Sequence, residues 1–180
     1  MSSILKVDTI QDQDGNNIIN ENAGTITIGK SGDTVNLASG ATAGFGKVLQ
    51  VVTAVNESTV STTSTSYVDI TSVTASITPN STSNKIMVIY SSDALYTLVS
   101  ATNVNYFHRV LRDATEISQR LLTAASASGG LQARGAMCIT ILDSPNTTSS
   151  VTYKAQHKLS SGSSTGSTLD TSITLMEIAG

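Results

Sequence analysis

Residues 15–46 read GNNIINENAGTITIGKSGDTVNLASGATAGFG. Their apolar residues come in pairs separated by turn formers, and Ile10, Ile18, Ile26 and Val35 stand eight, eight and nine residues apart. This spacing predicts a short β-repeat with tight turns. A single thin ribbon leaves its edges and apolar side chains in water, so it needs identical copies to cover them. We therefore expect a structural, oligomeric protein.

The composition limits the classes of function. The 180 residues suit one domain of roughly 130 residues plus an appendage. Charged residues make up 13% of the chain and the net charge is -3, so the basic surface that nucleic-acid binding needs is missing. No run approaches the ~20 apolar residues of a membrane helix, and the N-terminus lacks a signal peptide. We expect a soluble protein with no nucleic-acid partner and no membrane insertion.

The body that follows the repeat reads as strands throughout. The small residues ATAGFG at 41–46 mark a boundary between an N-terminal segment, 1–46, and a domain of residues 47–180. This domain shows no amphipathic helical period, and its strands are bounded by Ser, Thr and Asn clusters. We expect an all-β antiparallel sandwich resembling a jelly roll. The expected strands are 47–55, 66–77, 85–92, 105–113, 115–122, 135–142, 151–158 and 171–178.

The side-chain patterns of these strands differ. Residues 151–158 alternate between apolar and polar, which indicates a strand with one wet face. Residues 86–90 and 137–142 are apolar at nearly every position, so both of their faces need cover. Because a two-layer sandwich covers only one face, the other is expected to meet a second copy of the chain.

Two motifs suggest ligands that their context excludes. Residues 24–31, GTITIGKS, match the letters of a phosphate-binding loop, but the four central residues are alternating β-formers and no helix can follow. Residues 12–16 are similar to a calcium loop, yet Asn17 stands where that loop needs Gly and Ala23 where it needs Glu. Turn chemistry explains both stretches, and we expect no cofactor and no metal.

No spacing in the chain supports a catalytic site. His108, His157 and Cys138 are far apart in sequence and match no metal-binding or nucleophilic pattern. We interpret His108, beside Arg109 and Arg112, as a strand residue at a polar interface, and Cys138 as a small buried hydrophobe. A Ser/His/Asp triad cannot be tested in so Ser-rich a chain. We expect a protein that is not an enzyme.

Binding through loops stays open. Side chains placed to serve a loop-borne receptor site are Tyr96, Tyr106 and Arg134. The alternative is that these loops are solvated connections. The Gly- and Ser-rich loops in question are 97–104, 124–134 and 160–169.

The chain resembles a known family over nearly its whole length. The stretches that carry the resemblance are SSILKVDTIQDQDGNNIIN, TITIGKSGDTVNLASGAT, STTSTSYVDIT, SITPNSTSNKI, LRDATEI, ILDSPNTTSSVTYK and the terminal MEIAG. They are similar to the fibre proteins of tailed bacteriophages, especially marine and cyanobacterial ones. The resemblance implies that residues 1–46 form a virion-attachment segment and β-repeat stalk. It implies that residues 47–180 form a β-sandwich knob, and that the whole assembles as a homotrimer.

The same resemblance implies partners and a location. The N-terminal segment would dock on another virion protein of the tail or capsid, and the protein would lie on the virion surface after synthesis in the host cytoplasm. A host surface glycan is a candidate partner of the knob. A carbohydrate-binding receptor tip, a head fibre or capsid decoration protein without host contact, and an enzyme such as a capsule depolymerase are the alternatives.

Overall fold

The computed structural model describes residues 9–11, 13–14, 17–22, 25–28, 48–97, 104–124 and 132–180. The chain divides into two compact units, Met1–Phe45 and Gly46–Gly180. Every regular element in the described ranges is a β-strand, and no helix there could cross a membrane.

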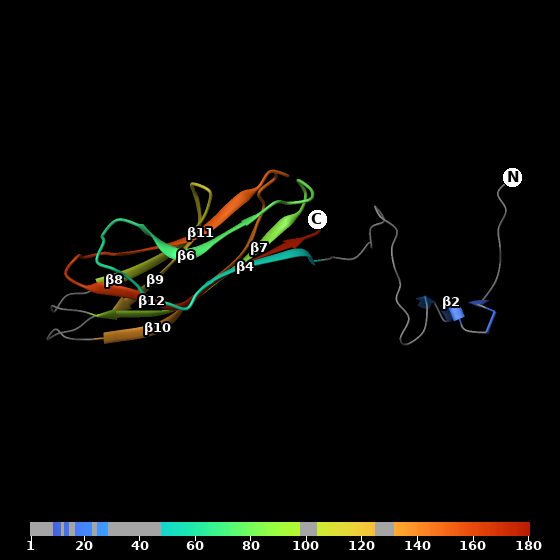
Figure 1. The fold of residues 1–180 in the computed structure, drawn as a ribbon, viewed down its shortest axis with the longest axis horizontal. Coiled ribbons are helices and arrows are strands. Elements are labelled where there is room, and N and C mark those ends of the chain that lie inside the picture. The colour runs from blue at the N-terminus through green and yellow to red at the C-terminus, as the bar shows by residue number, and fades with distance from the viewer. Residues whose placement is uncertain are drawn as a thin grey trace. The chain divides into compact units, whose positions relative to one another are not determined.

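The first unit holds a three-stranded antiparallel ribbon, coloured blue in Figure 1. Its strands are β1 (Thr9–Gln11), β2 (Asn17–Asn22) and β3 (Thr25–Ile28), in the order β1-β2-β3. Strand β3 occupies the centre of the stretch that resembles a phosphate-binding loop, as the alternation of β-formers predicts. The residues on either side of β3, and Val35 of the expected repeat, lie outside the described residues.

The register of the ribbon aligns three isoleucines, two of which are not in the repeat spacing read from the sequence. Ile10 pairs with Ile19, and Ile19 pairs with Ile28, so residues nine apart form one cross-strand row. Ile26 instead pairs with Glu21, so the spacing through Ile18 and Ile26 is not the pairing register.

The described residues of the second unit form nine strands. All eight expected strands are present, several of them longer at one end or both, and β5 is an additional short strand. The strands are β4 (Val48–Asn56), β5 (Val60–Thr62), β6 (Val68–Ile77), β7 (Lys85–Thr97), β8 (Val104–Arg112), β9 (Thr115–Ala124), β10 (Gln132–Asp143), β11 (Val151–Leu159) and β12 (Thr165–Ile178).

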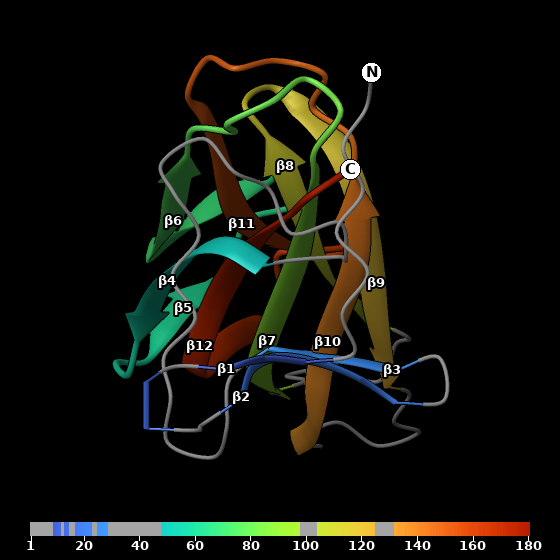
Figure 2. The same ribbon diagram turned by 90° about the vertical axis from the view of Figure 1, so that its right-hand side faces the viewer.

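These strands form a sandwich of two antiparallel sheets. One sheet has the order β10-β7-β12-β4, with β5 also paired to β12, and the other has the order β6-β11-β8-β9. Figure 2 shows β4, β12, β7 and β10 side by side. The chain is folded like one long hairpin with its tip between β8 and β9. From the ends to the tip, the paired strands are β4–β12, β6–β11, β7–β10 and β8–β9. Successive pairs belong alternately to one sheet and to the other. This is a jelly-roll topology, as expected.

The core lies between the two sheets and follows the period of two. In β11, residues from Val151 to Leu159 alternate between buried and half-buried, which confirms the strand with one wet face. In β7, Ile86, Val88 and Tyr90 are fully buried, while the alternate residues point to the other side of the sheet. The sandwich therefore covers one face of each sheet, and the other described strands of this unit do not cover the two outer faces.

Candidate functional surfaces

Two of the three residues expected at a receptor site are buried. Tyr96 and Tyr106 lie in β7 and β8 with no exposed surface, and the Tyr96 hydroxyl donates a hydrogen bond to the carbonyl of Val104. Strand β7 runs to Thr97, five residues beyond its expected end, so Tyr96 takes an inward position of a strand rather than a loop position. The structure thus corrects the expectation that these rings face a receptor.

Arg134, the third residue, is exposed in β10. Its guanidinium donates hydrogen bonds to Oδ2 of Asp93 in β7, and this partner raises the pKa of Arg134 and lowers that of Asp93. Because the two tyrosine rings lie in the core and Arg134 lies on an outer face, the three side chains form no common site.

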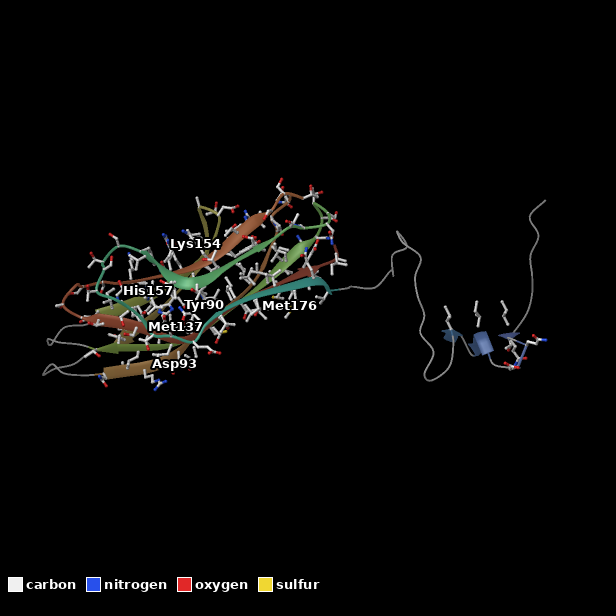
Figure 3. All side chains as sticks on the ribbon, viewed as in Figure 1. Tyr90, Asp93, Met137, Lys154, His157 and Met176 are labelled. Atoms are coloured by element: carbon white, nitrogen blue, oxygen red, sulfur yellow. The ribbon has the colours of Figure 1, made fainter. Side chains whose placement is uncertain are left out.

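A cluster of tyrosines and histidines fills the centre of the core. His108 and His157 are paired residues of β8 and β11, and their ring centroids lie 6.1 Å apart. The Tyr90 hydroxyl is 2.6 Å from Nδ1 of His108, and the Tyr106 hydroxyl is 2.7 Å from Nδ1 of His157. Figure 3 labels Tyr90 and His157 within the body. His108 is therefore a core residue, not the polar-interface residue that its arginine neighbours suggested, because its phase in β8 points inward.

Burial keeps both histidines neutral. It lowers the pKa of His108 to about 3, with a further contribution from neighbouring His157, and it lowers the pKa of His157 to about 4. Burial also raises the pKa of Tyr90 and Tyr106. Nε2 of each histidine has no hydrogen-bond partner among the described residues. The cluster therefore packs the core and is closed to solvent.

The described residues contain no group of three or more His, Cys, Asp or Glu side chains that could hold a metal ion. Cys138 lies apart from the histidines, exposed on the outer side of β10. This corrects its assignment as a buried hydrophobe, which rested on the apolar run around it. The alternation of β10 buries Met137 and Ile139 and turns Cys138 outward.

The outer side of the five-stranded sheet carries what we call the uncharged face. It consists of three cross-strand rows that each span β10, β7, β12 and β4. The first row is mainly apolar, the second and third are mixed with hydroxyl groups, and one further apolar pair lies beyond the first row. The rows are Leu142–Met87–Met176–Val51, Thr140–Ile89–Thr174–Thr53 and Cys138–Ser91–Ser172–Val55, and the pair is Ile178–Val48.

Much of this face is open to water in the single chain. Val51 is 55% exposed, Val55 is 53% exposed and Leu142 is 51% exposed. No side chain of the three rows carries a charge. The runs 86–90 and 137–142 are predicted to need cover on both faces, and the described strands of the sandwich cover only one.

The outer side of the four-stranded sheet carries a contrasting charged face. One row joins Asp69, Gln156, Arg109 and Gln119 across β6, β11, β8 and β9. A neighbouring row joins Lys158 and Phe107 to an exposed leucine, Leu121. Lys154, which Figure 3 labels on β11, and Glu116 of β9 complete the face together with Tyr67, which directly precedes β6.

The polar side chains of the charged face are bound to one another. Gln156 donates to Asp69 at 2.6 Å and accepts from Nε and Nη2 of Arg109 at 2.8 and 2.6 Å. Arg109 also pairs with Glu116 at 2.9 Å, and its guanidinium carbon lies 3.7 Å from the centre of the Tyr67 ring. This arrangement holds planar polar groups and an aromatic ring in fixed positions at the surface.

The charged face includes residues that the sequence did not single out. Tyr67 and Phe107 are both contacted by the Lys158 ammonium, at 4.6 and 5.2 Å from the ring centres. The alternation of β8 does indicate this face: Tyr106 and His108 point into the core, so Phe107 and Arg109, between and after them, point to the outer side of the sheet.

Comparisons with known proteins give only a distant structural similarity. No protein-family model matches the chain, and no curated protein is similar to it in sequence. A structure of infectious bursal disease virus, Gt strain, matches 80% of this chain and 37% of its own, with 14% identity and a TM-score of 0.43. A VP2 subviral particle of the same virus matches 81% of this chain and 43% of its own, with 11% identity and a TM-score of 0.31. The chain spans less than half the length of these virus proteins.

Proposed function

We propose that this protein is a virion structural protein, a short homotrimeric fibre or spike of a bacteriophage. In this proposal residues 1–46 attach to another protein of the tail or capsid and form the stalk, and residues 47–180 form the knob. Its task is mechanical and adhesive rather than catalytic. The resemblance of the sequence to phage fibre proteins supports this function, and so do the jelly-roll body and the ribbon that precedes it.

The observation that carries the proposal is the row of isoleucines on the ribbon. Ile10, Ile19 and Ile28 align across β1, β2 and β3 and are 40%, 37% and 54% exposed. Three strands of three to six residues bury little apolar surface, and units of so few residues usually need oligomerisation or another staple to be stable. Identical ribbons that pack on this row would bury it in every copy, which is the arrangement that stacked repeats use.

Assembly would serve a particle outside the cell. Strands packed between copies raise the barrier to unfolding, and three copies of one weakly binding surface gain avidity without a new contact. Both effects suit a fibre that must persist on a virion and touch a host repeatedly.

The solution mass of the purified full chain tests the proposal. We expect light scattering to give three times 18.6 kDa, and we expect the variant Ile10→Ser/Ile19→Ser/Ile28→Ser to dissociate at a higher protein concentration than the wild type. A monodisperse wild-type monomer would overturn the homotrimer and with it the fibre.

A second candidate function is recognition of a carbohydrate by the charged face. The observation that favours it is the half-buried aromatic pair, Tyr67 and Phe107, next to the fixed polar row of Asp69, Gln156 and Arg109. Sugar rings stack their C–H faces on aromatic rings and bond their hydroxyls to planar polar groups.

Binding to an array of purified bacterial surface polysaccharides tests this second function. We expect Phe107→Ala to lose binding to any polysaccharide that the wild type retains, while Glu57→Ala in the exposed loop after β4 keeps it. No binding by the wild type would favour a decoration protein without host contact. Release of reducing ends during incubation would instead indicate a depolymerase.

A further inference from the structure

We propose that the uncharged face of the five-stranded sheet is the surface on which the second and third copies of this chain pack in the knob. This inference rests on the proposed homotrimer and names the partner, the face and the rows that meet. It is carried by the body of residues 48–180, independently of the isoleucine row on the ribbon.

The composition of the face suits burial against another protein surface. With strands ~4.8 Å apart and residues on one side of a strand ~6.7 Å apart, its three rows cover on the order of 400 Å². Its first row is apolar throughout, and contiguous exposed apolar surface is a mark of protein–protein interaction sites. Depletion of charge with enrichment of Met and aliphatic residues is typical of the core of a subunit interface.

Two of the five hydroxyl groups of the face already bond to each other. Thr53 and Thr174, neighbours in the second row, are 3.2 Å apart through their Oγ1 atoms, so each already has a hydrogen-bond partner. A polar group that is paired within its own chain can be desolvated at a much lower cost than an unpaired one.

Charged side chains stand only beyond the three rows. At one end Lys85 donates to Ser144 at 2.8 Å, and at the other end Arg134 is paired with Asp93. Because these groups find partners within the chain, they can form the polar rim that surrounds an apolar interface core.

Connectivity favours a second copy of this chain as the occupant. The body begins at Gly46, and Val48, two residues later, is itself part of the face beside Ile178. If residues 1–45 of several copies assemble, they therefore raise the effective concentration of this end of the uncharged face of one copy near the same surface of the other copies. A face without charges carries no pattern for steering an unlike partner, whereas it is compatible with copies of itself.

Cys138 supplies a direct reporter, since it is the only cysteine of the chain and lies in the third row, exposed in the single chain. The experiment measures the rate at which the native full chain reacts with a thiol reagent, alongside its mass by light scattering. Two variants form a matched pair: Leu142→Lys on the uncharged face and Leu121→Lys on the charged face. The two leucines are 51% and 52% exposed, and both lie in edge strands.

We expect the wild type and Leu121→Lys to be trimers in which Cys138 reacts about tenfold or more slowly than in the urea-unfolded chain. We expect Leu142→Lys to weaken trimer association by about tenfold or more and to restore fast labelling, because an ammonium would be buried without a partner. A wild-type trimer with fast-reacting Cys138 and no effect of Leu142→Lys would overturn this interface while leaving the homotrimer intact. A wild-type monomer would overturn the homotrimer itself.

Discussion

The two outer faces of the sandwich are built on the same scaffold and have opposite chemistry. On the charged face, cross-strand neighbours bind one another, as Asp69, Gln156 and Arg109 do. On the uncharged face, the corresponding positions hold Met87, Met176 and Val51, whose apolar side chains offer their neighbours no hydrogen bond or ion pair. Cross-strand pairs of either kind stabilise a sheet. The stability of the sheet therefore does not by itself explain why the uncharged face is apolar. Exposure of its apolar side chains to water costs free energy unless a partner covers them.

Acid is expected to have the largest effect, because it breaks the core that holds both faces in place. The folded pKa values of His108 and His157, about 3 and about 4, lie below the value near 6.5 of an unfolded histidine. Unfolding therefore takes up protons below pH ~6.5, and each histidine costs about 1.4 kcal/mol of stability per pH unit down to its folded pKa. The contribution of the two neutral histidines to stability is fully present above pH ~6.5.

Urea unfolding at pH 7 and pH 5 measures this loss, which we expect to be on the order of 4 kcal/mol for the two histidines together. The variant His108→Gln/His157→Gln should lose much less over the same interval, whatever its stability at pH 7. An equal loss in both proteins would contradict the role of the histidines.

The next largest effect concerns the end of the sandwich where the uncharged face begins. Glu177 of β12 is fully buried and accepts hydrogen bonds from Gln50 of β4, the backbone of Asn80 and the side chain of Asn84, at 2.6, 2.6 and 2.5 Å. Burial raises its pKa, but these hydrogen bonds together outweigh burial and lower it. We expect Glu177→Ala to reduce the free energy of unfolding by about 2–4 kcal/mol, since several donors lose their acceptor.

Thermal unfolding of Glu177→Ala checks this expectation, with Glu57→Ala in the exposed loop after β4 as control. A loss below about 0.5 kcal/mol, which is the usual range for exposed sites, would show that water replaces the carboxylate.

Exchanging charge between the faces should have an intermediate effect. Met176→Lys places an ammonium in the first row of the uncharged face. We expect the dissociation constant of the trimer to rise by about tenfold or more. Lys158→Met removes a cation from the charged face and should leave the trimer intact while increasing nonspecific association. Sedimentation velocity over a dilution series distinguishes the two. Equal behaviour of the two variants would erase the distinction between the faces.

The smallest effect is expected on the charged face itself. Arg109→Met removes the contacts with Gln156, Glu116 and the Tyr67 ring but keeps much of the side-chain volume. We expect a loss of about 0.5–1.5 kcal/mol that shrinks in high salt, because the pair with Glu116 is partly exposed. Thermal unfolding at two salt concentrations measures it. A loss that does not depend on salt would assign the effect to the Tyr67 stack instead.

Much of the fold follows from local sequence. The eight main strands are predictable because β-branched and alternating residues are interrupted by Ser, Asn and Pro at nearly every connection. Strand ends are less predictable: the sequence predicts a strand that ends at Ser92, whereas pairing with β10 and β12 extends β7 to Thr97 and includes Tyr96. Tertiary pairing outweighs local preference at this point.

The surfaces are less predictable than the strands. The phase of His157, in step with Val151, Tyr153 and Ala155, does indicate that it is buried. The row Leu142–Met87–Met176–Val51 cannot be inferred in the same way, because it joins residues of four strands whose register is fixed only by long-range pairing. An apolar run shows that a strand has two apolar sides, but it does not show which one the chain itself covers.

Hydroxyl-radical footprinting of the wild-type full chain compares the two faces most directly. At a concentration where the protein is assembled, we expect Met87 and Met176 to be protected and Phe107 and Leu121 to be labelled, and dilution below the dissociation concentration should expose the two methionines alone. Methionines that are labelled as fast in the assembled protein as in the dissociated chain would contradict the claim that copies of the chain cover the uncharged face.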